Sequence, residues 1–129
     1  MNCPFCEAID LGRARDCGGG VHVLRDNYPI SDGHLLVIPA VHAGSLSDLD
    51  PDLVQRLFKV AAEEGIRMRS EGLCDDFNIG LNDGPMAGQT VPHVHIHVIP
   101  RRQGDVADPR GGVRWIIAEK ADYWTEARG

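Results

Sequence analysis

The chain has 129 residues, 43% of them hydrophobic, and a formal net charge of −6 at pH 7, which fits one globular domain spanning residues 1–129. The acidic balance argues against a nucleic-acid-binding protein, and no apolar run approaches the about 20 residues of a membrane span. The N-terminus lacks the basic and apolar regions of a signal peptide, so the four cysteines predict a reducing, cytoplasmic setting.

The first half of the chain predicts a hairpin followed by a long helix. Residues 21–25 alternate as a strand, and residues 34–39 form a second strand that is apolar enough to be central. The pair Asp50-Pro51 then fits a helix N-cap followed by proline at the first helical position. We expect this helix to run to about residue 71, to end at Gly72 and to pack on the sheet.

The second half predicts further strands of the same sheet. Residues 76–82 alternate again, a glycine-rich connection covers residues 83–89, and residues 93–99 form the next strand. Residues 113–117 are interpreted as a last short strand. Neighbouring strands joined in this way predict an α+β fold, an antiparallel sheet of about five strands with one long helix packed on it.

Three histidines alternate along the strand at residues 93–99, and they are half of the six in the chain. A strand has a period of two, so His93, His95 and His97 lie on one face. Such a row suits either a three-histidine catalytic metal site or a nucleophilic imidazole flanked by two others. On an extended strand, residues four apart are separated by about 13 Å, which favours the middle histidine as the reacting group.

A Cys-x-x-Cys motif, Cys3-Pro4-Phe5-Cys6, lies at the N-terminus. Alone it is half of a zinc site. A redox dithiol is the main rival, and we disfavour it because no strand precedes the motif and we do not expect it to open a helix. Two unpaired thiols remain a third interpretation.

The residues around the histidines resemble those of the histidine triad family of nucleotidyl hydrolases and transferases. The resemblance rests on GQTVPHVHIHVIPR at residues 88–101, NDG at residues 82–84, and GHLLVIP at residues 33–39 with His42 beyond it. It covers roughly residues 1–101, and residues 102–129 look like the variable tail of such proteins. The cysteine pair and the glycine-rich segment look most like microbial members related to diadenosine polyphosphate hydrolases.

The resemblance implies a division of roles among the site residues. His95 would attack the α-phosphorus and form a nucleotidyl-histidine intermediate, with a neighbouring main-chain carbonyl fixing its tautomer. The other residues of the catalytic group would be His93, His97 and His34. Residues that would contact the substrate are Asp26 at the ribose hydroxyls, Phe5 in the base pocket, and Asn82, Gln89 and Thr90 at the phosphate and leaving group.

The resemblance also implies a structural zinc ion held by Cys3, Cys6, His42 and His93, a purine nucleotide substrate, and a homodimer formed partly through the helix and a sheet edge. No organic cofactor, nucleic acid or membrane partner is expected. The substrate class stays open between diadenosine polyphosphates and nucleoside phosphoramidates. Two alternatives also remain, a nucleotide-binding scaffold with incidental catalysis and a metalloenzyme with all three histidines of the strand on one metal.

Overall fold

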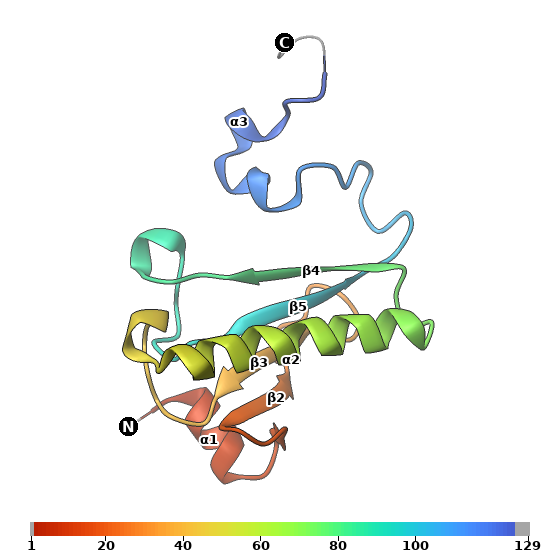
Figure 1. Ribbon diagram of the computed structural model, residues 1–129. Helices are drawn as coiled ribbons and strands as arrows, with labels where there is room; N and C mark the ends of the chain where they lie inside the picture. Colours follow the sequence, from red (N-terminus) through yellow and green to blue (C-terminus); the bar gives the residue numbers. More distant parts are fainter. Residues whose placement is uncertain (1, 126–129) are drawn as a thin grey trace.

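A computed structural model describes residues 2–125 as a five-stranded antiparallel sheet with helices on both faces (Figure 1). The strand order is β1-β2-β3-β5-β4. The strands are β1 (Arg15–Asp16), β2 (Val21–Arg25), β3 (Leu35–Pro39), β4 (Asp76–Leu81) and β5 (Ile96–Arg101). The helices are α1 (Pro4–Asp10), α2 (Pro51–Ser70) and α3 (Ala118–Ala121), with short 3-10 turns η1 (Leu46–Asp48), η2 (Pro85–Ala87) and η3 (Gly112–Ile117). The predicted α+β class is confirmed.

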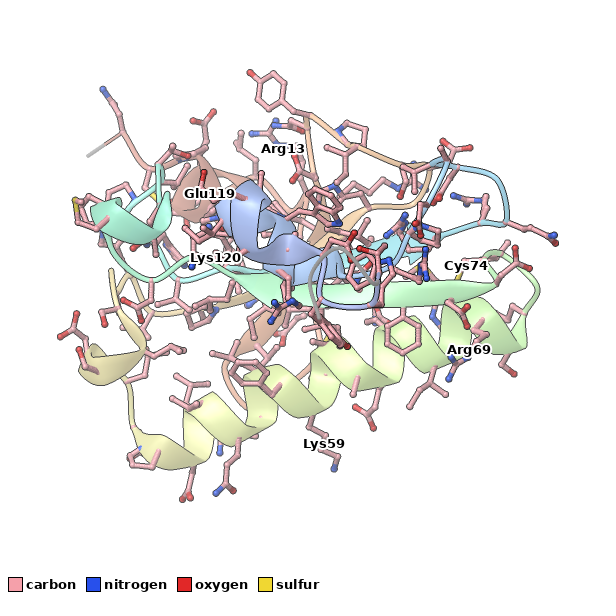
Figure 2. All side chains as sticks on the ribbon, turned by 90° about the horizontal axis from the view of Figure 1, so that it is seen from above. Arg13, Lys59, Arg69, Cys74, Glu119 and Lys120 are labelled. Atoms are coloured by element: carbon pink, nitrogen blue, oxygen red, sulfur yellow. The ribbon has the colours of Figure 1, made fainter. Side chains whose placement is uncertain are left out.

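The long helix α2 covers one face of the sheet (Figure 1). It begins as predicted, because Oδ1 of Asp50 accepts a hydrogen bond from the amide of Asp52 and caps the first turn. Its inner face buries Leu57 and Ala61 completely against the sheet. Lys59 projects from the opposite side of the helix into solvent (Figure 2). Among residues 2–125, no helix combines the length and apolar character needed to cross a membrane.

The other face of the sheet carries α1 and a smaller apolar cluster. Phe5 of α1 packs with Leu36 and Ile38 of β3, which alternate with the residues that face α2. Leu36 pairs with His97 of β5 across the sheet. The third histidine of the row therefore lies on the α1 face, away from the long helix.

The predicted start of the strand that carries the histidines is wrong. β5 begins at Ile96, so His93 and His95 precede the strand. Here Pro39 at the end of β3 has no amide hydrogen to donate to the ladder, and the amide of Val94 bonds to the carbonyl of Ala43 instead.

The segment interpreted as a last strand, residues 113–117, forms the 3-10 turn η3. The turn is capped by Gly111 and begins at Gly112, and both glycines have positive φ. It is tied to α3 because the Arg114 guanidinium donates to the carbonyls of Lys120 and Ala121. The segment is thus held by hydrogen bonds from the Arg114 side chain, and not by the backbone hydrogen bonds that a strand makes to its neighbour. Figure 1 places this segment beyond β4, the edge strand of the sheet.

Candidate functional site

Two cysteines and two histidines meet where α1 approaches the start of β5. Cys3 caps α1 and Cys6 lies in its first turn, His42 follows β3, and His93 precedes β5. The Sγ of Cys3 lies 3.4 Å from Nδ1 of His93, and the Sγ of Cys6 lies 3.3 Å from Nδ1 of His42 and 3.6 Å from that of His93. The two Nδ1 atoms are 3.2 Å apart.

These four donors fit a tetrahedral metal ion of the zinc type. Zinc–sulfur and zinc–nitrogen bonds of about 2.3 and 2.1 Å place neighbouring ligand atoms about 3.3 to 3.8 Å apart in a tetrahedron. The fully buried His93 holds its Nε2 2.9 Å from the carbonyl of Pro39, so Nε2 carries the hydrogen and Nδ1 presents a lone pair to the cluster. Burial, with the adjacent Cys3 thiol, raises the pKa of Cys6, and a bound cation would oppose that shift.

His95 is oriented by the residue two positions before it. Its Nδ1 lies 2.8 Å from the carbonyl oxygen of His93. Because a carbonyl only accepts, Nδ1 carries the hydrogen and Nε2 is left with a free lone pair. The Phe5 ring packs edge-on at 5.0 Å between centroids and keeps the imidazole 8% exposed at the pocket wall. In the neutral form of this imidazole, the nucleophilic nitrogen is therefore Nε2.

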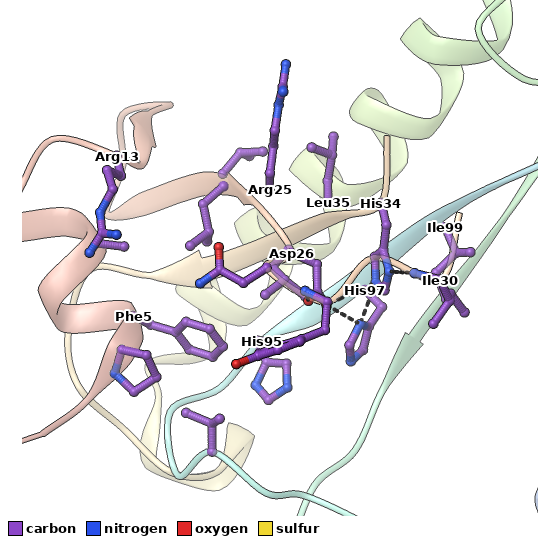
Figure 3. Close-up of a pocket in the computed structure, with 18 of the residues that line it drawn as sticks. Phe5, Arg13, Arg25, Asp26, Ile30, His34, Leu35, His95, His97 and Ile99 are labelled. Carbon is purple, nitrogen blue, oxygen red and sulfur yellow. Dashed lines mark hydrogen bonds and ion pairs between the residues drawn. The ribbon is translucent and has the colours of Figure 1, made fainter. Parts of the chain in front are cut away.

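His97 belongs to a second polar cluster, which it forms with His34 and Asp26 (Figure 3). Its Nδ1 lies 2.9 Å from Nε2 of His34, and Oδ2 of Asp26 lies 3.4 Å from the same His34 atom and 3.8 Å from Nδ1 of His97. Burial lowers the pKa of both His34 and His97, while the Asp26 carboxylate opposes the shift. The ligand atoms of these three residues are also close enough together to share a metal ion.

An open pocket of about 1190 Å³ lies in front of the histidines (Figure 3). Of the residues expected to contact substrate, four line it: Phe5, Asp26, Asn82 and Thr90. The fifth, Gln89, lies outside this lining and braces the glycine-rich loop. Its Oε1 accepts from the amide of Gly84, and its Nε2 donates to the carbonyls of Gly44 and Val91.

The structure does not bring the three alternating histidines to one ion. Within residues 2–125, the groups of side chains able to share a metal place His93 with the cysteines and His97 with Asp26, and His95 belongs to neither. The expectation that Cys-x-x-Cys does not open a helix is wrong, because Cys3 is the N-cap of α1. The histidine neighbours of Cys6 nevertheless favour a metal over a redox dithiol.

Sequence reasoning anticipated a main-chain carbonyl beside His95, but it missed the main-chain groups that orient His93 and His34. The carbonyl of Pro39 holds His93, and the amide of Ile30 donates to Nδ1 of His34 at 3.2 Å. Neither residue type signals such a role, since every residue offers a carbonyl and every residue except proline offers an amide hydrogen.

Comparison with known proteins identifies the family to which these features belong. A model of the HIT domain family matches residues 19–104. An uncharacterized HIT-like protein of Mycobacterium tuberculosis is 38% identical over 109 residues, which cover 81% of this chain and 75% of that protein. A Schizosaccharomyces pombe protein named bis(5'-nucleosyl)-tetraphosphatase [asymmetrical] is 41% identical over 80 residues, covering 62% of this chain and 44% of that protein. The crystal structure of a zinc-bound histidine triad family protein from Mycobacterium smegmatis superimposes with a TM-score of 0.75 at 34% identity and 94% coverage of both chains.

Proposed function

Because the chain belongs to the HIT domain family, we propose that it is a nucleotidyl hydrolase that cleaves nucleotide derivatives at the α-phosphate, with His95 as the nucleophile. The observation that carries the proposal is the hydrogen bond from Nδ1 of His95 to the carbonyl of His93. It leaves the lone pair on Nε2, and a neutral imidazole attacks phosphorus without first losing a proton.

The proposed reaction proceeds by two displacements. In the first, a bond forms between Nε2 of His95 and the α-phosphorus while the bond to the leaving group breaks. In the second, water attacks the same phosphorus and releases the nucleoside monophosphate from His95. His97 is the neighbour placed to exchange a proton with the leaving group and then with water, since both imidazoles line one pocket with ring centroids 5.2 Å apart.

We propose that the substrate is a purine dinucleoside polyphosphate or a nucleoside phosphoramidate. The Phe5 ring at the pocket wall suits an aromatic base, and Asp26 carries a carboxylate that can accept from ribose hydroxyls. Asn82 and Thr90 line the pocket with neutral polar groups that suit a phosphate and a leaving group. The fission yeast relative named as a tetraphosphatase supports the first substrate class.

We propose that Cys3, Cys6, His42 and His93 hold a structural zinc ion. The donor distances of 3.2 to 3.6 Å suit tetrahedral coordination, and four protein ligands close the site to substrate. The zinc-bound relative from M. smegmatis supports this assignment. Four unpaired cysteines suit the reducing cytoplasm in which we place the protein.

We also propose that the single domain forms homodimers, partly through the long helix α2 and partly through the outer edge of β4. This strand is the outermost of the sheet, and the tail beside it exposes Trp115 and Tyr123 by 50% and 66%. Light scattering on the purified protein is expected to give twice the mass of one chain. A monomer at micromolar concentration would contradict this assignment.

The nucleophile is tested by His95→Ala, with His22→Ala on β2 as the control. Products from diadenosine tetraphosphate and adenosine phosphoramidate are separated by chromatography. The His95 variant is expected to lose turnover on every substrate that the wild type cleaves and to keep its Tm, while the His22 variant stays active. Undiminished hydrolysis by His95→Ala would overturn the proposal, and tight nucleotide binding without any monophosphate release by the wild type would favour a scaffold.

A further inference from the structure

The hydrogen-bond pattern around His34 fixes where its proton lies. The amide of Ile30 donates to Nδ1 of His34, so the hydrogen of the neutral ring is on Nε2. That Nε2–H points at Nδ1 of His97, 2.9 Å away. In this state Nδ1 of His97 accepts, and the single hydrogen of His97 is on Nε2.

The same pattern argues against a metal ion among Asp26, His34 and His97. A histidine that binds a metal through one nitrogen usually donates the other N–H to a carbonyl or carboxylate, as His93 does to Pro39. Here the second nitrogen of His34 faces a donor, the Ile30 amide, so freeing Nε2 for a metal would set two N–H groups against each other. The contacts of these three side chains therefore suit protonated nitrogens and not a bound metal ion.

We propose that Asp26 has a second role beyond ribose binding: it is a positioning residue that lets His97 carry a second proton, on Nδ1. This proposal deepens the proposed hydrolase function and rests on it for the catalytic step. A hydrogen on Nδ1 of His97 would oppose the Nε2–H of His34 and needs another acceptor. Oδ2 of Asp26 lies 3.8 Å from Nδ1 of His97 and 3.4 Å from Nε2 of His34, so the carboxylate is within ion-pair distance of both nitrogens.

With this proton in place, His97 can act as acid and then as base. In the first displacement, Nε2 of His97 gives its proton to the leaving group as the bond from His95 to phosphorus forms. His97 is then neutral, with its hydrogen on Nδ1, stabilised by the nearby Asp26 carboxylate, and a lone pair on Nε2. In the second displacement, Nε2 takes one proton from the attacking water as the bond from phosphorus to His95 breaks, which restores the starting state.

Without Asp26, the neutral His97 would keep the tautomer that His34 imposes. Its hydrogen would lie on Nε2, where the second displacement needs a lone pair. Among residues 2–125, the titratable groups that act on His97 are His34, His95 and Asp26. The neighbouring strands β3 and β4 place Leu36 and Gly80 opposite it. Asp26 is the negative charge among them, and its carboxylate raises the pKa of His97 against the effect of burial.

The first test separates this role from ribose binding. Asp26→Asn and wild type are compared on a ribonucleotide substrate and on its 2',3'-dideoxy analogue, which lacks the hydroxyls that Asp26 would bind. We expect kcat of the variant to fall at least about tenfold on both substrates, since proton transfer by a positioned group accelerates a reaction by about 10²-fold to 10⁴-fold. If Asp26 serves the ribose alone, the variant and wild type will have equal kcat on the dideoxy substrate, and the proposal fails.

The second test needs no enzymatic activity. Histidine ring resonances of ¹⁵N-labelled protein are followed against pH, with the His97 signals assigned from a His97→Gln variant. In Asp26→Asn the pKa of His97 is expected to fall by about one unit. Asp32→Asn, a neutralisation in the same β2–β3 loop, is the control and should leave it unchanged. An unchanged pKa of His97 in Asp26→Asn overturns the proposal even if the wild type hydrolyses no nucleotide, so this outcome is distinct from failure of the proposed function.

Discussion

Removal of one cysteine ligand should distinguish a fold that is stabilised by a bound metal ion from one in which the same side chains bind no metal. In Cys3→Ser, a hydroxyl replaces the buried sulfur that faces Nδ1 of His93 at 3.4 Å. Hydroxyl oxygen is a poor zinc ligand, so the variant is expected to purify without zinc while the wild type carries one ion per chain. Cys17→Ser, at a half-buried cysteine outside the cluster, is the matched control.

The size of the effect follows from linkage. Zinc present at a thousandfold above its Kd stabilises the native state by about 4.1 kcal/mol if it binds the native state alone. For 129 residues, an unfolding entropy of about 2.1 cal/mol/K per residue amounts to about 0.27 kcal/mol/K, so Cys3→Ser should lower Tm by about 15 °C.

Metal content is measured by mass spectrometry after dialysis, and Tm by circular dichroism with and without a chelator. The chelator should lower Tm of the wild type and of Cys17→Ser to near the value of Cys3→Ser, which should not respond. A wild-type protein without zinc, or a Cys3→Ser variant that retains one ion per chain, would refute the assignment of these ligands.

Three further predictions concern packing and pH. A Cβ added at Gly65 of α2 would lie 2.5 Å from the Phe77 ring, so Gly65→Ala should destabilise the fold by about 1 to 3 kcal/mol in urea unfolding. A Cβ added at Gly80 meets nothing within 4 Å, so the control Gly80→Ala should change the urea midpoint little. Equal midpoints for the two variants would show that α2 moves away from the sheet at little cost. Leu57→Ala empties a fully buried position and should cost about 2 to 5 kcal/mol by the same assay, and a loss below 1 kcal/mol would place Leu57 outside the core. Burial lowers the pKa of His34 below its ordinary 6.5. As the pH falls through about 6.5, His34 therefore takes up a proton in the unfolded chain before it does so in the native protein. The contribution of neutral His34 to the free energy of unfolding is complete above about pH 6.5 and declines below it. Urea unfolding at pH 7.5 and 5.5 should show a smaller decrease in the free energy of unfolding for His34→Gln than for wild type. Equal decreases would exclude His34 as the group whose protonation causes the loss of stability.

The sequence predicts those elements whose residues carry local signals. Alternation in β2 identifies Val21 and Val23 as the buried face, and both are almost fully buried against α2. The N-cap of α2 is equally predictable from the sequence. The Asp50 side chain accepts a hydrogen bond from an amide that has no partner within the helix, and the proline that follows suits the first helical position. These elements form where the pattern places them because periodicity and capping act over neighbouring residues.

The remaining features depend on contacts distant in sequence. The start of β5 shifts to Ile96 because the amide of Val94 bonds to Ala43, some fifty positions earlier, and no local pattern marks that bond. The apolar residues of η3 read as a strand, yet glycines with positive φ and the Arg114 side chain turn them into a 3-10 segment. The tautomer of His34 likewise depends on the Ile30 amide, whose direction is a property of the folded loop.

A single residue joins the proposed metal site to the proposed nucleophile. The side chain of His93 faces the cysteines, while its carbonyl oxygen accepts the Nδ1–H of His95 at 2.8 Å. A displacement of His93 therefore moves the atom that orients the nucleophile. Since misplacement of a reacting group by about 1 Å can reduce the rate a hundredfold, loss of the metal should reduce kcat by about tenfold to a hundredfold.

This coupling is tested at His42, which belongs to the metal cluster and lies outside the pocket lining. His42→Ala removes one donor, whereas His42→Cys restores a four-ligand set of three thiolates and His93. We expect His42→Ala to lose zinc and kcat together, with the Kd for a non-hydrolysable nucleotide unchanged, and His42→Cys to recover both. A zinc-free variant with wild-type kcat would show that the strand holds His95 in place without the metal, and that the two halves of the site work independently.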